Sequence, residues 1–304
     1  MEKNESSFKY IKTIGYGDGD ITSLDIFPNG NYISISRKGI VYIWKDLQVI
    51  QSYKIENNGN YVIGIKDNKN LVVISDDRVA LFWNKEQEFF KVKKELKLNM
   101  HDSKIKNVFY YNGNYFMCSD DLITVWEEYI YNNELNYQLQ MKIRDQKDFF
   151  SSLFIPKKNL FVTGGKLGLK MWNLNNLSLI NNPKASEALK SINCKSSSLL
   201  KLFDDDSIIV GTPNKKISII NLSTFQINNI SFEKECSAIC VLMDLFFVSS
   251  DLNLYIFNKK TLQKMDIIEN ASMTKEINDI KEIKKNQLAL YAYSGYIRLF
   301  SNHL

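Results

Sequence analysis

The sequence predicts an all-β protein built from one repeated unit, and three observations support this prediction. First, 18 Phe and 16 Tyr against only 13 Gly and 4 Pro among 304 residues favour strands. Second, the four tryptophans, Trp44, Trp83, Trp126 and Trp172, are spaced 39, 43 and 46 residues apart. Third, each tryptophan ends a short alternating run, such as GIVYIW or RVALFW, which is the pattern of a half-buried strand.

The same kind of run recurs without tryptophan in the second half of the chain. KKISII, LNLYIF and GYIRLF end at Ile220, Phe257 and Phe300, so seven runs follow one another at steps of 37 to 48 residues. Their last residues, called the anchors below, are Trp44, Trp83, Trp126, Trp172, Ile220, Phe257 and Phe300. A fixed period of this length indicates a repeat architecture.

The second unit shows the expected elements in order. Strand YVIGI (61–65) leads through a polar turn into LVVIS (71–75), and a tight turn at Asp76–Asp77 leads into VALFW (79–83). A more exposed strand follows near 89–96, and the third unit repeats this order with an Asn-Gly hairpin signal at 112–113. Four hairpin-linked strands repeated seven times predict a seven-bladed β-propeller of antiparallel blades, as a single domain over residues 1–304.

On these features the units resemble WD40 repeats, which have about 40–45 residues and end in Trp-Asp. The resemblance extends from about residue 8 to 304, but the signature is degenerate. The anchors are followed by Lys45, Asn84, Glu127, Asn173, Asn221, Asn258 and Ser301 rather than by Asp. The turn aspartate of the family is matched by Asp77, Asp120 and Asp251, and its Gly-His pair only by His101.

The resemblance also predicts how the chain closes. Strand-like FKYIKTI (8–14) precedes the first unit, and only four residues follow the last anchor. In WD-repeat propellers the N-terminal strand completes the last blade, and closure removes an exposed edge. We therefore expect Phe8–Ile14 to pair with 296–300.

The resemblance implies structural roles for the signature residues. His101, Asp120 and Trp126 match three members of the hydrogen-bond network found in WD-repeat blades. The hydroxyl that completes it is not evident, because YFMC on the second strand has none and Ser119 lies nearer the turn. We expect structural roles for the residues Trp44, Trp83, Trp126, Trp172, His101, Asp77, Asp120 and Asp251.

Candidate catalytic and metal sites are weak. The acidic runs at 76–77, 120–121 and 204–206 fall in turns, where Asp bonds the local backbone, and none has the spacing of a calcium loop. GYGDG (15–19) resembles a phosphate loop, but it contains acid and precedes no helical pattern. One histidine without a nucleophile does not make a catalytic centre. We expect no catalytic residue, metal or cofactor.

Basic residues gather in the turns between second and third strands, which in WD-repeat propellers emerge on the usual partner-binding face. They are Arg37, Lys38, Arg78, Lys166, Lys215 and Lys216. Blades three and six carry Asp120 and Asp251 there instead. A discontinuous positive rim suits an acidic peptide or a phosphate backbone. The alternative is a solvated charged face with no partner.

Two longer connections depart from the bare repeat. In 181–196, Pro183 and apolar residues at helical spacing, from Ala185 to Ile192, predict a short amphipathic helix on the rim. It would pack on its own blade or contact a partner. EEYIYNNELNY (127–137) is expected to be a loop whose acidic and aromatic mixture is common at interfaces.

Composition limits the function. The net charge of +5 is spread along the chain, no apolar run approaches the ~20 residues of a membrane span, and no signal peptide is visible. The four cysteines lack zinc-site spacing and are expected to be buried thiols in a reducing compartment. We expect a cytoplasmic scaffold, with the nucleus left open, that binds one or more proteins as a monomer within a complex. The alternatives are an RNA-associated assembly factor and a ligand-binding or enzymatic propeller.

Overall fold

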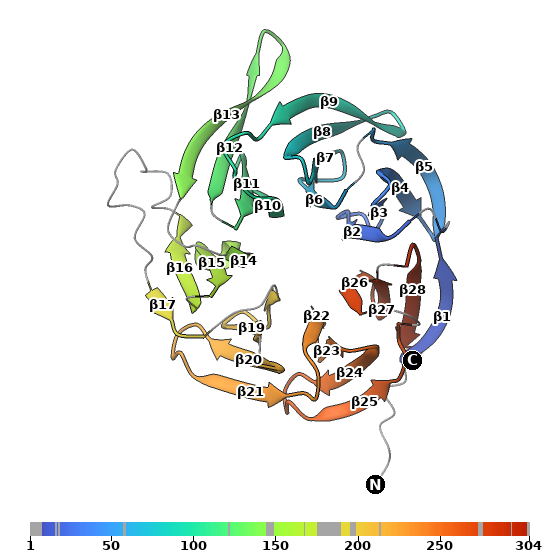
Figure 1. The fold of residues 1–304 in the computed structure, drawn as a ribbon, viewed down its shortest axis with the longest axis vertical. Coiled ribbons are helices and arrows are strands. Elements are labelled where there is room, and N and C mark those ends of the chain that lie inside the picture. The colour runs from blue at the N-terminus through green and yellow to red at the C-terminus, as the bar shows by residue number, and fades with distance from the viewer. Residues whose placement is uncertain are drawn as a thin grey trace. The chain divides into compact units, whose positions relative to one another are not determined.

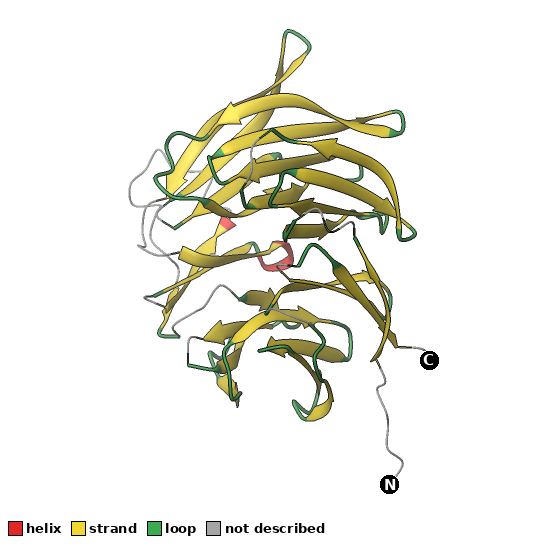
Figure 2. Cartoon of the chain, turned by 45° about the vertical axis from the view of Figure 1, so that its right-hand side comes forward, coloured by secondary structure: helices red, strands yellow, loops and turns green. Residues whose placement is uncertain are grey.

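The computed structural model describes residues 8–302, except for 16, 18, 57–58, 121, 144–148, 167, 175–189, 195–198, 213, 273–275 and 293. Strands make up most of this part of the chain, and a 3-10 turn, η1 (Pro156–Lys158), precedes β15 (Leu160–Gly165) (Figure 2). Among the described residues no helix is long and apolar enough to cross a membrane.

The described strands form seven four-stranded antiparallel sheets, as the repeat predicts (Figure 1). The first has the order β2 (Ile21–Ile26), β3 (Tyr32–Ser36), β4 (Ile40–Lys45), β5 (Gln48–Lys54). The second has the order β6 (Tyr61–Ile65), β7 (Asn70–Ser75), β8 (Val79–Glu86), β9 (Phe89–Lys97). The third has the order β10 (Ile105–Tyr111), β11 (Asn114–Ser119), β12 (Ile123–Tyr131), β13 (Glu134–Ile143). The fourth has the order β14 (Phe149–Ile155), β15 (Leu160–Gly165), β16 (Gly168–Asn173), β17 (Lys190–Ile192).

The remaining sheets follow the same plan. The fifth has the order β18 (Leu200–Leu202), β19 (Ser207–Thr212), β20 (Lys216–Asn221), β21 (Ile227–Ser231). The sixth has the order β22 (Cys236–Val241), β23 (Leu245–Ser250), β24 (Asn253–Asn258), β25 (Lys264–Ile268). The seventh has the order β26 (Ile277–Lys284), β27 (Gln287–Ala292), β28 (Ile297–Asn302), β1 (Phe8–Ile14).

Contacts divide the chain into two compact units. One comprises Met1–Asn60 with Phe203–Leu304, and the other comprises Tyr61–Leu202. The first holds the first, sixth and seventh sheets and strands β19–β21, and the second holds the second, third and fourth sheets and β18.

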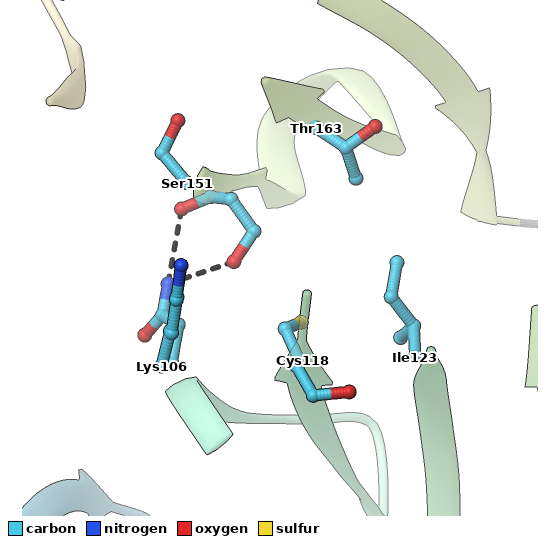
Figure 3. Close-up of a pocket in the computed structure, with 8 residues that line it drawn as sticks. Lys106, Cys118, Ile123, Ser151 and Thr163 are labelled. Carbon is cyan, nitrogen blue, oxygen red and sulfur yellow. Dashed lines mark hydrogen bonds between the residues drawn. The ribbon is translucent and has the colours of Figure 1, made fainter. Parts of the chain in front are cut away.

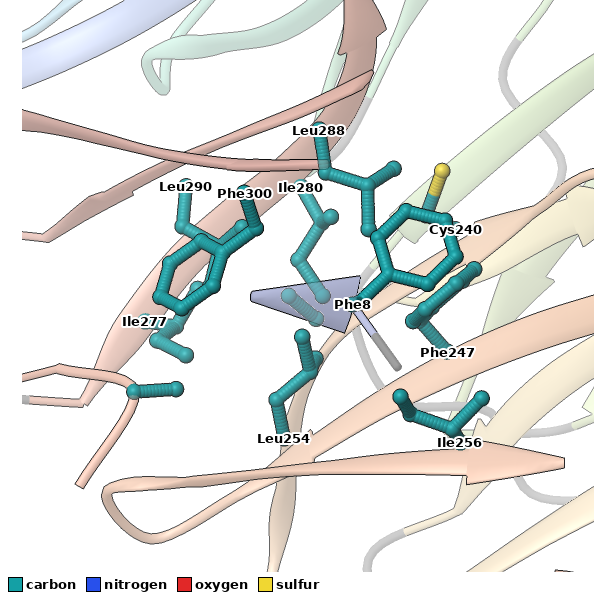
Figure 4. Packing of buried hydrophobic residues seen from close by; sticks show 12 residues of the cluster. Phe8, Cys240, Phe247, Leu254, Ile256, Ile277, Ile280, Leu288, Leu290 and Phe300 are labelled. Atoms are coloured by element: carbon teal, nitrogen blue, oxygen red, sulfur yellow. The ribbon is translucent and has the colours of Figure 1, made fainter. Parts of the chain in front are cut away.

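The N-terminal strand completes the seventh sheet, which confirms the predicted closure. β1 pairs antiparallel with β28, in a register that runs from Phe8 opposite Asn302 to Ile14 opposite Ile297. Phe8 is 4% exposed and packs edge-on against Phe247 of β23, with ring centroids 4.9 Å apart. Figure 4 shows the Phe8 side chain within an apolar cluster drawn from the sixth and seventh sheets. Through Phe8, strand β1 therefore contributes to this apolar core.

Five of the seven anchors lie beside the same backbone irregularity, which the sequence alone does not reveal. Beside four of them the register between the third and fourth strands shifts, so that one extra residue bulges from the fourth strand. These four anchors are Trp44, Trp83, Trp126 and Phe257. β1 has the same shift between Tyr10 and Lys12, opposite Phe300. The anchor position is thus a property of the repeat that survives the change from Trp to Phe.

Turn chemistry explains the hairpins. At 112–113 both Asn112 (φ 46°) and Gly113 (φ 83°) have positive φ, as a type I′ turn requires. At 29–30 only Gly30 has positive φ, and its N–H donates to the carbonyl of Phe27.

The two longer connections differ from expectation. Residues 127–137 are not a loop, because β12 and β13 continue through them as a hairpin whose tip projects at the top of Figure 1. Residues 181–189 and 195–196, where most of the predicted helix falls, lie outside the described residues. Ile192 lies in strand β17 opposite Leu169, contrary to the predicted helix, because the fourth strand is needed to cover the edge of β16.

Candidate partner-binding site

The tryptophan anchors face the interior. All four are at most 6% exposed. The indole N–H of Trp44 donates to Ser34 Oγ at 2.9 Å, and that of Trp172 donates to Thr163 Oγ1 at 3.0 Å. Both acceptors lie on the second strand of their sheet. Buried indoles with internal acceptors are unsuited to stacking on an external ligand.

In the third sheet a directed chain of hydrogen bonds runs through the buried His101. Ser119 Oγ donates to the carbonyl of Leu122 at 3.0 Å, so it must accept from His101 Nδ1 at 2.8 Å. Nε2 of the neutral ring then accepts from Thr124 Oγ1 at 2.8 Å, and Thr124 in turn accepts from Trp126 Nε1 at 2.9 Å. Both ring nitrogens of His101 are engaged in this series of hydrogen bonds, so the role of His101 is structural.

Asp120 does not join this chain, unlike the arrangement expected from the resemblance. Its carboxylate forms an ion pair with Lys106, and its backbone N–H donates to Ser103 Oγ. Asp77 accepts from the Ser75 hydroxyl, and Asp251 occupies an exposed turn position with φ of 57°.

Thr124 is the member that sequence reasoning missed. Ser34 and Thr163 supply the hydroxyl from the second strand, two residues before its end in each case, where the third sheet has Met117. Met117 pairs with Thr124 across the two strands. In the third sheet the hydroxyl therefore comes from the third strand instead of the second. A Thr on the third strand, paired with an apolar residue at the usual hydroxyl position, is the sequence signal that could have revealed it.

The predicted basic residues lie in the expected turns, but some are engaged within the protein. Arg37 Nη1 is 3.9 Å from the Asp20 carboxylate, and its Nη2 donates to Asn60 at 3.4 Å. Arg78 is half-buried and donates to the carbonyl of His101. Lys38, which adjoins Arg37, is exposed, as are Lys166 after β15 and Lys215–Lys216 at the start of β20. The positive turns are therefore separate small groups, and Arg78 serves the fold.

A small cavity lies between the third and fourth sheets. It has a volume of about 10 Å³, room for about one water, and its lining includes Cys118, Ser119 and Thr163 (Figure 3). Asn107 Nδ2 donates to Ser152 Oγ at 2.8 Å across it. Burial raises the pKa of the Cys118 thiol to about 12, so little thiolate is present near neutral pH. The cavity is too small and too inert for a substrate. Within the described part of the chain, no group of three or more His, Cys, Asp or Glu residues could hold a metal ion.

A larger pocket of about 340 Å³ lies in the seventh sheet, beside the turn between its second and third strands. Its lining includes Thr13, Ile277, Leu290, Tyr291, Tyr296 and Arg298. Arg298 Nη1 donates to the carbonyls of Asn270 (2.9 Å) and Ala271 (2.5 Å). The guanidinium also lies over the rings of Tyr10 and Phe300, 4.7 and 5.5 Å from their centroids. No motif in the sequence marks Arg298.

Gly15, Gly17 and Gly19, from the GYGDG segment, lie close to the turn that borders this pocket. They connect β1 to β2 and pack against the β27–β28 turn, where a Cβ on Gly15 would lie 2.7 Å from the Gly295 carbonyl oxygen. These three glycines are closely packed between the two strands, and Tyr296 lies beside Gly15 and Gly17 with 45% of its surface exposed.

The third sheet presents the most exposed aromatic group on the described surface. Beyond the last β11–β12 pair, Asn114 with Glu127, four further pairs carry β12 and β13 outward as a two-stranded ribbon. A turn with positive φ at Asn132 (51°) and Asn133 (63°) ends it, as type I′ geometry requires. The exposed fractions at the tip are 40% for Tyr129, 76% for Ile130 and 64% for Tyr131. We call these three residues the hairpin tip.

Comparison with known proteins agrees with this architecture. Residues 8–45 match the family model "WD domain, G-beta repeat". That stretch holds β1 and the first three strands of the first sheet, the offset by which a sequence repeat joins two blades. None of the curated proteins compared with the chain matches it.

Two solved structures are similar over nearly the whole chain. The WD40 beta propeller domain of Doa1 has a TM-score of 0.74 at 14% identity, over 98% of this chain and 97% of that one. The Myceliophteria thermophila Cps50 (Swd1) beta-propeller domain has a TM-score of 0.76 at 13% identity, over 97% and 99%. The fold is a seven-bladed β-propeller of four-stranded blades, similar to the propellers of these two WD40-type structures. Propellers of this class commonly bind proteins and are generally non-catalytic.

Proposed function

We propose that this chain is a non-catalytic scaffold, a cytoplasmic monomer that holds partner proteins within a larger complex. The observation that carries the proposal is the hairpin tip. Three large apolar or aromatic side chains there lie on a hydrogen-bonded ribbon. Tyr is enriched among the residues that dominate binding energy at protein interfaces.

The ribbon suits this role because it is preformed. Its backbone is fixed by strand pairing and by the Asn132–Asn133 turn, so a partner has little chain entropy to remove on binding. Its root is fixed as well, because Tyr137 stacks on Phe82 with ring centroids 3.6 Å apart. Exposed Glu127 and Glu134 flank the tip. The partner surface that fits is an apolar patch bordered by basic groups.

The alternative of an RNA-associated factor rests on the basic turns, and no specific contact favours it. Arg37 and Arg78 make the internal contacts described above. A steep fall in RNA affinity with rising salt would be the signature of that function.

Quantitative affinity purification of the tagged full-length chain tests the scaffold proposal. The variant combines Ile130→Ser with Tyr131→Ser, and the control is Met243→Ser, an 80% exposed apolar residue in the β22–β23 turn. We expect the hairpin variant to lose a defined set of partners by about tenfold or more, while the control keeps them. Equal recovery by the two variants would reject the hairpin as the binding surface.

A further inference from the structure

We propose that the pocket around Arg298 binds a peptide segment in which a large apolar side chain lies next to an Asp or Glu. The inference rests on the proposed scaffold function only in taking the ligand to be part of a protein. It adds a second binding site, with a defined ligand chemistry, to the hairpin tip.

The main evidence for an acidic ligand is the positive charge of Arg298. Among the described residues no carboxylate pairs with this guanidinium, and its Nε is enclosed by protein with no acceptor. The two backbone carbonyls that bond Nη1 and the two aromatic rings offset part of the cost of burying a cation. Neither supplies a formal negative charge to balance this half-buried cation, whose Nε is fully enclosed. A ligand carboxylate would complete the site.

The rest of the lining indicates that the ligand also has an apolar side chain. Ile277, Leu290 and the ring of Tyr291 make the pocket mostly apolar, and its volume of about 340 Å³ is near the lower end for ligand sites. That volume suits one anchoring side chain with its flanking backbone better than a large cofactor. Exposed Tyr296 at the mouth adds an aromatic surface of the kind found at binding hot spots.

Contacts within the chain hold the wall of this pocket in place. Arg298 ties the chain at 270–271 to β28, and Tyr10 packs on Phe300 with centroids 5.8 Å apart. A preformed pocket of this kind gains affinity because it does not have to be ordered on binding.

Ligand-observed NMR on the purified full-length chain tests the proposal, with three hexapeptides as probes. Gly-Ser-Leu-Asp-Ser-Gly carries both features, Gly-Ser-Leu-Asn-Ser-Gly lacks the charge, and Gly-Ser-Ser-Asp-Ser-Gly lacks the apolar anchor. We expect the first to bind about tenfold or more tighter than either of the others, because one lacks a charge-assisted hydrogen bond and the other lacks the burial of a leucine side chain. No detectable binding of the first at about 1 mM, or equal binding of all three, overturns the proposal.

A variant assigns the binding to this pocket without removing Arg298, which supports the fold. Ser294→Asp places a carboxylate in the lining, where it competes with the ligand for Arg298. Thr261→Asp adds the same charge in an exposed turn elsewhere. We expect the first to weaken the Leu-Asp peptide about tenfold and the second to leave it unchanged, with equal unfolding midpoints. Equal affinities for the two variants would place the binding elsewhere. Partner recovery through the hairpin tip is a separate readout, so this proposal can fail while the scaffold proposal stands.

Discussion

Phe8 on the N-terminal strand packs edge-on against Phe247 on β23, with ring centroids 4.9 Å apart. The contact joins the strand that closes the seventh blade to the blade before it. Phe8 is the only fully buried side chain on β1, and the five residues that follow it are exposed.

Replacing Phe8 with Ala is therefore expected to lower the free energy of unfolding by about 3 kcal/mol, through lost burial and the cavity left behind. Lys9→Ala, on the exposed face of the same strand, is the control and should change it by less than about 0.5 kcal/mol. Denaturant titration measures both. Equal effects would mean that closure does not depend on this core.

Thr124→Val tests the hydrogen-bond chain through His101. The change preserves shape but leaves His101 Nε2 and Trp126 Nε1 without their partner in a buried site. The expected loss is about 2–4 kcal/mol in unfolding free energy, from two unsatisfied groups. Thr261→Val in an exposed turn is the matched control. If Thr124→Val leaves the free energy of unfolding unchanged, the hydrogen bonds through His101 contribute nothing to stability.

Lys281 and Lys284 lie on the same strand, but we expect them to contribute very different amounts to the free energy of unfolding. Lys281 is 26% exposed and lies 3.3 Å from Asp25 and 3.6 Å from Asp279. Burial lowers its pKa, but the two carboxylates outweigh burial and raise it. Lys281→Met should cost about 3 kcal/mol, because it leaves the carboxylates uncompensated.

Lys284 pairs with Asp46 at 2.8 Å, but both side chains are more than half exposed. Lys284→Met should therefore cost less than about 1 kcal/mol. Similar costs for the two variants would contradict the idea that burial gives the Lys281 cluster its strength.

Alkaline pH should destabilise the protein before lysine titration is complete. Burial raises the pKa of Tyr61 to about 12 and raises those of Tyr32, Tyr115 and Tyr291 as well. In the unfolded chain these phenols ionise near pH 10. A raised pKa in the folded state contributes stability below that pH, and the contribution is lost as pH rises towards the folded value.

The unfolding midpoint is therefore expected to fall between about pH 9 and 11. Tyr61→Phe should reduce the slope of that fall. A midpoint that stays constant across this range would be inconsistent with protonated, buried tyrosines.

The sequence could reveal the repeat because each anchor ends a run with period two and the runs recur. It also gave the closing strand, since Phe8–Ile14 has no inner strands of its own. The hairpin at 127–137 was predictable in principle, because alternating YIY and ELNY flank Asn-Asn, a pair that tolerates positive φ. The loop interpretation overlooked that turn signal.

Other features depend on contacts that no local pattern encodes. Thr124 replaces a second-strand hydroxyl only because strand pairing places it opposite Met117. Arg298 lies in an ordinary third strand, and its position beneath the β27–β28 turn comes from the packing of β1 and residues 270–271 around it. Arg78 illustrates the reverse case, a basic turn residue turned inward by the carbonyl of His101.

The most direct test of the scaffold account is photo-crosslinking from the hairpin tip in cells of the source organism. A benzophenone amino acid replaces Tyr131 in the full-length chain, and Met243 in the control, which exposes a comparable apolar side chain on another blade. The account predicts that position 131 captures a protein that is also lost from affinity purification of the Ile130→Ser, Tyr131→Ser variant, and that position 243 does not. Capture of the same proteins from both positions, or of none from position 131, would contradict it.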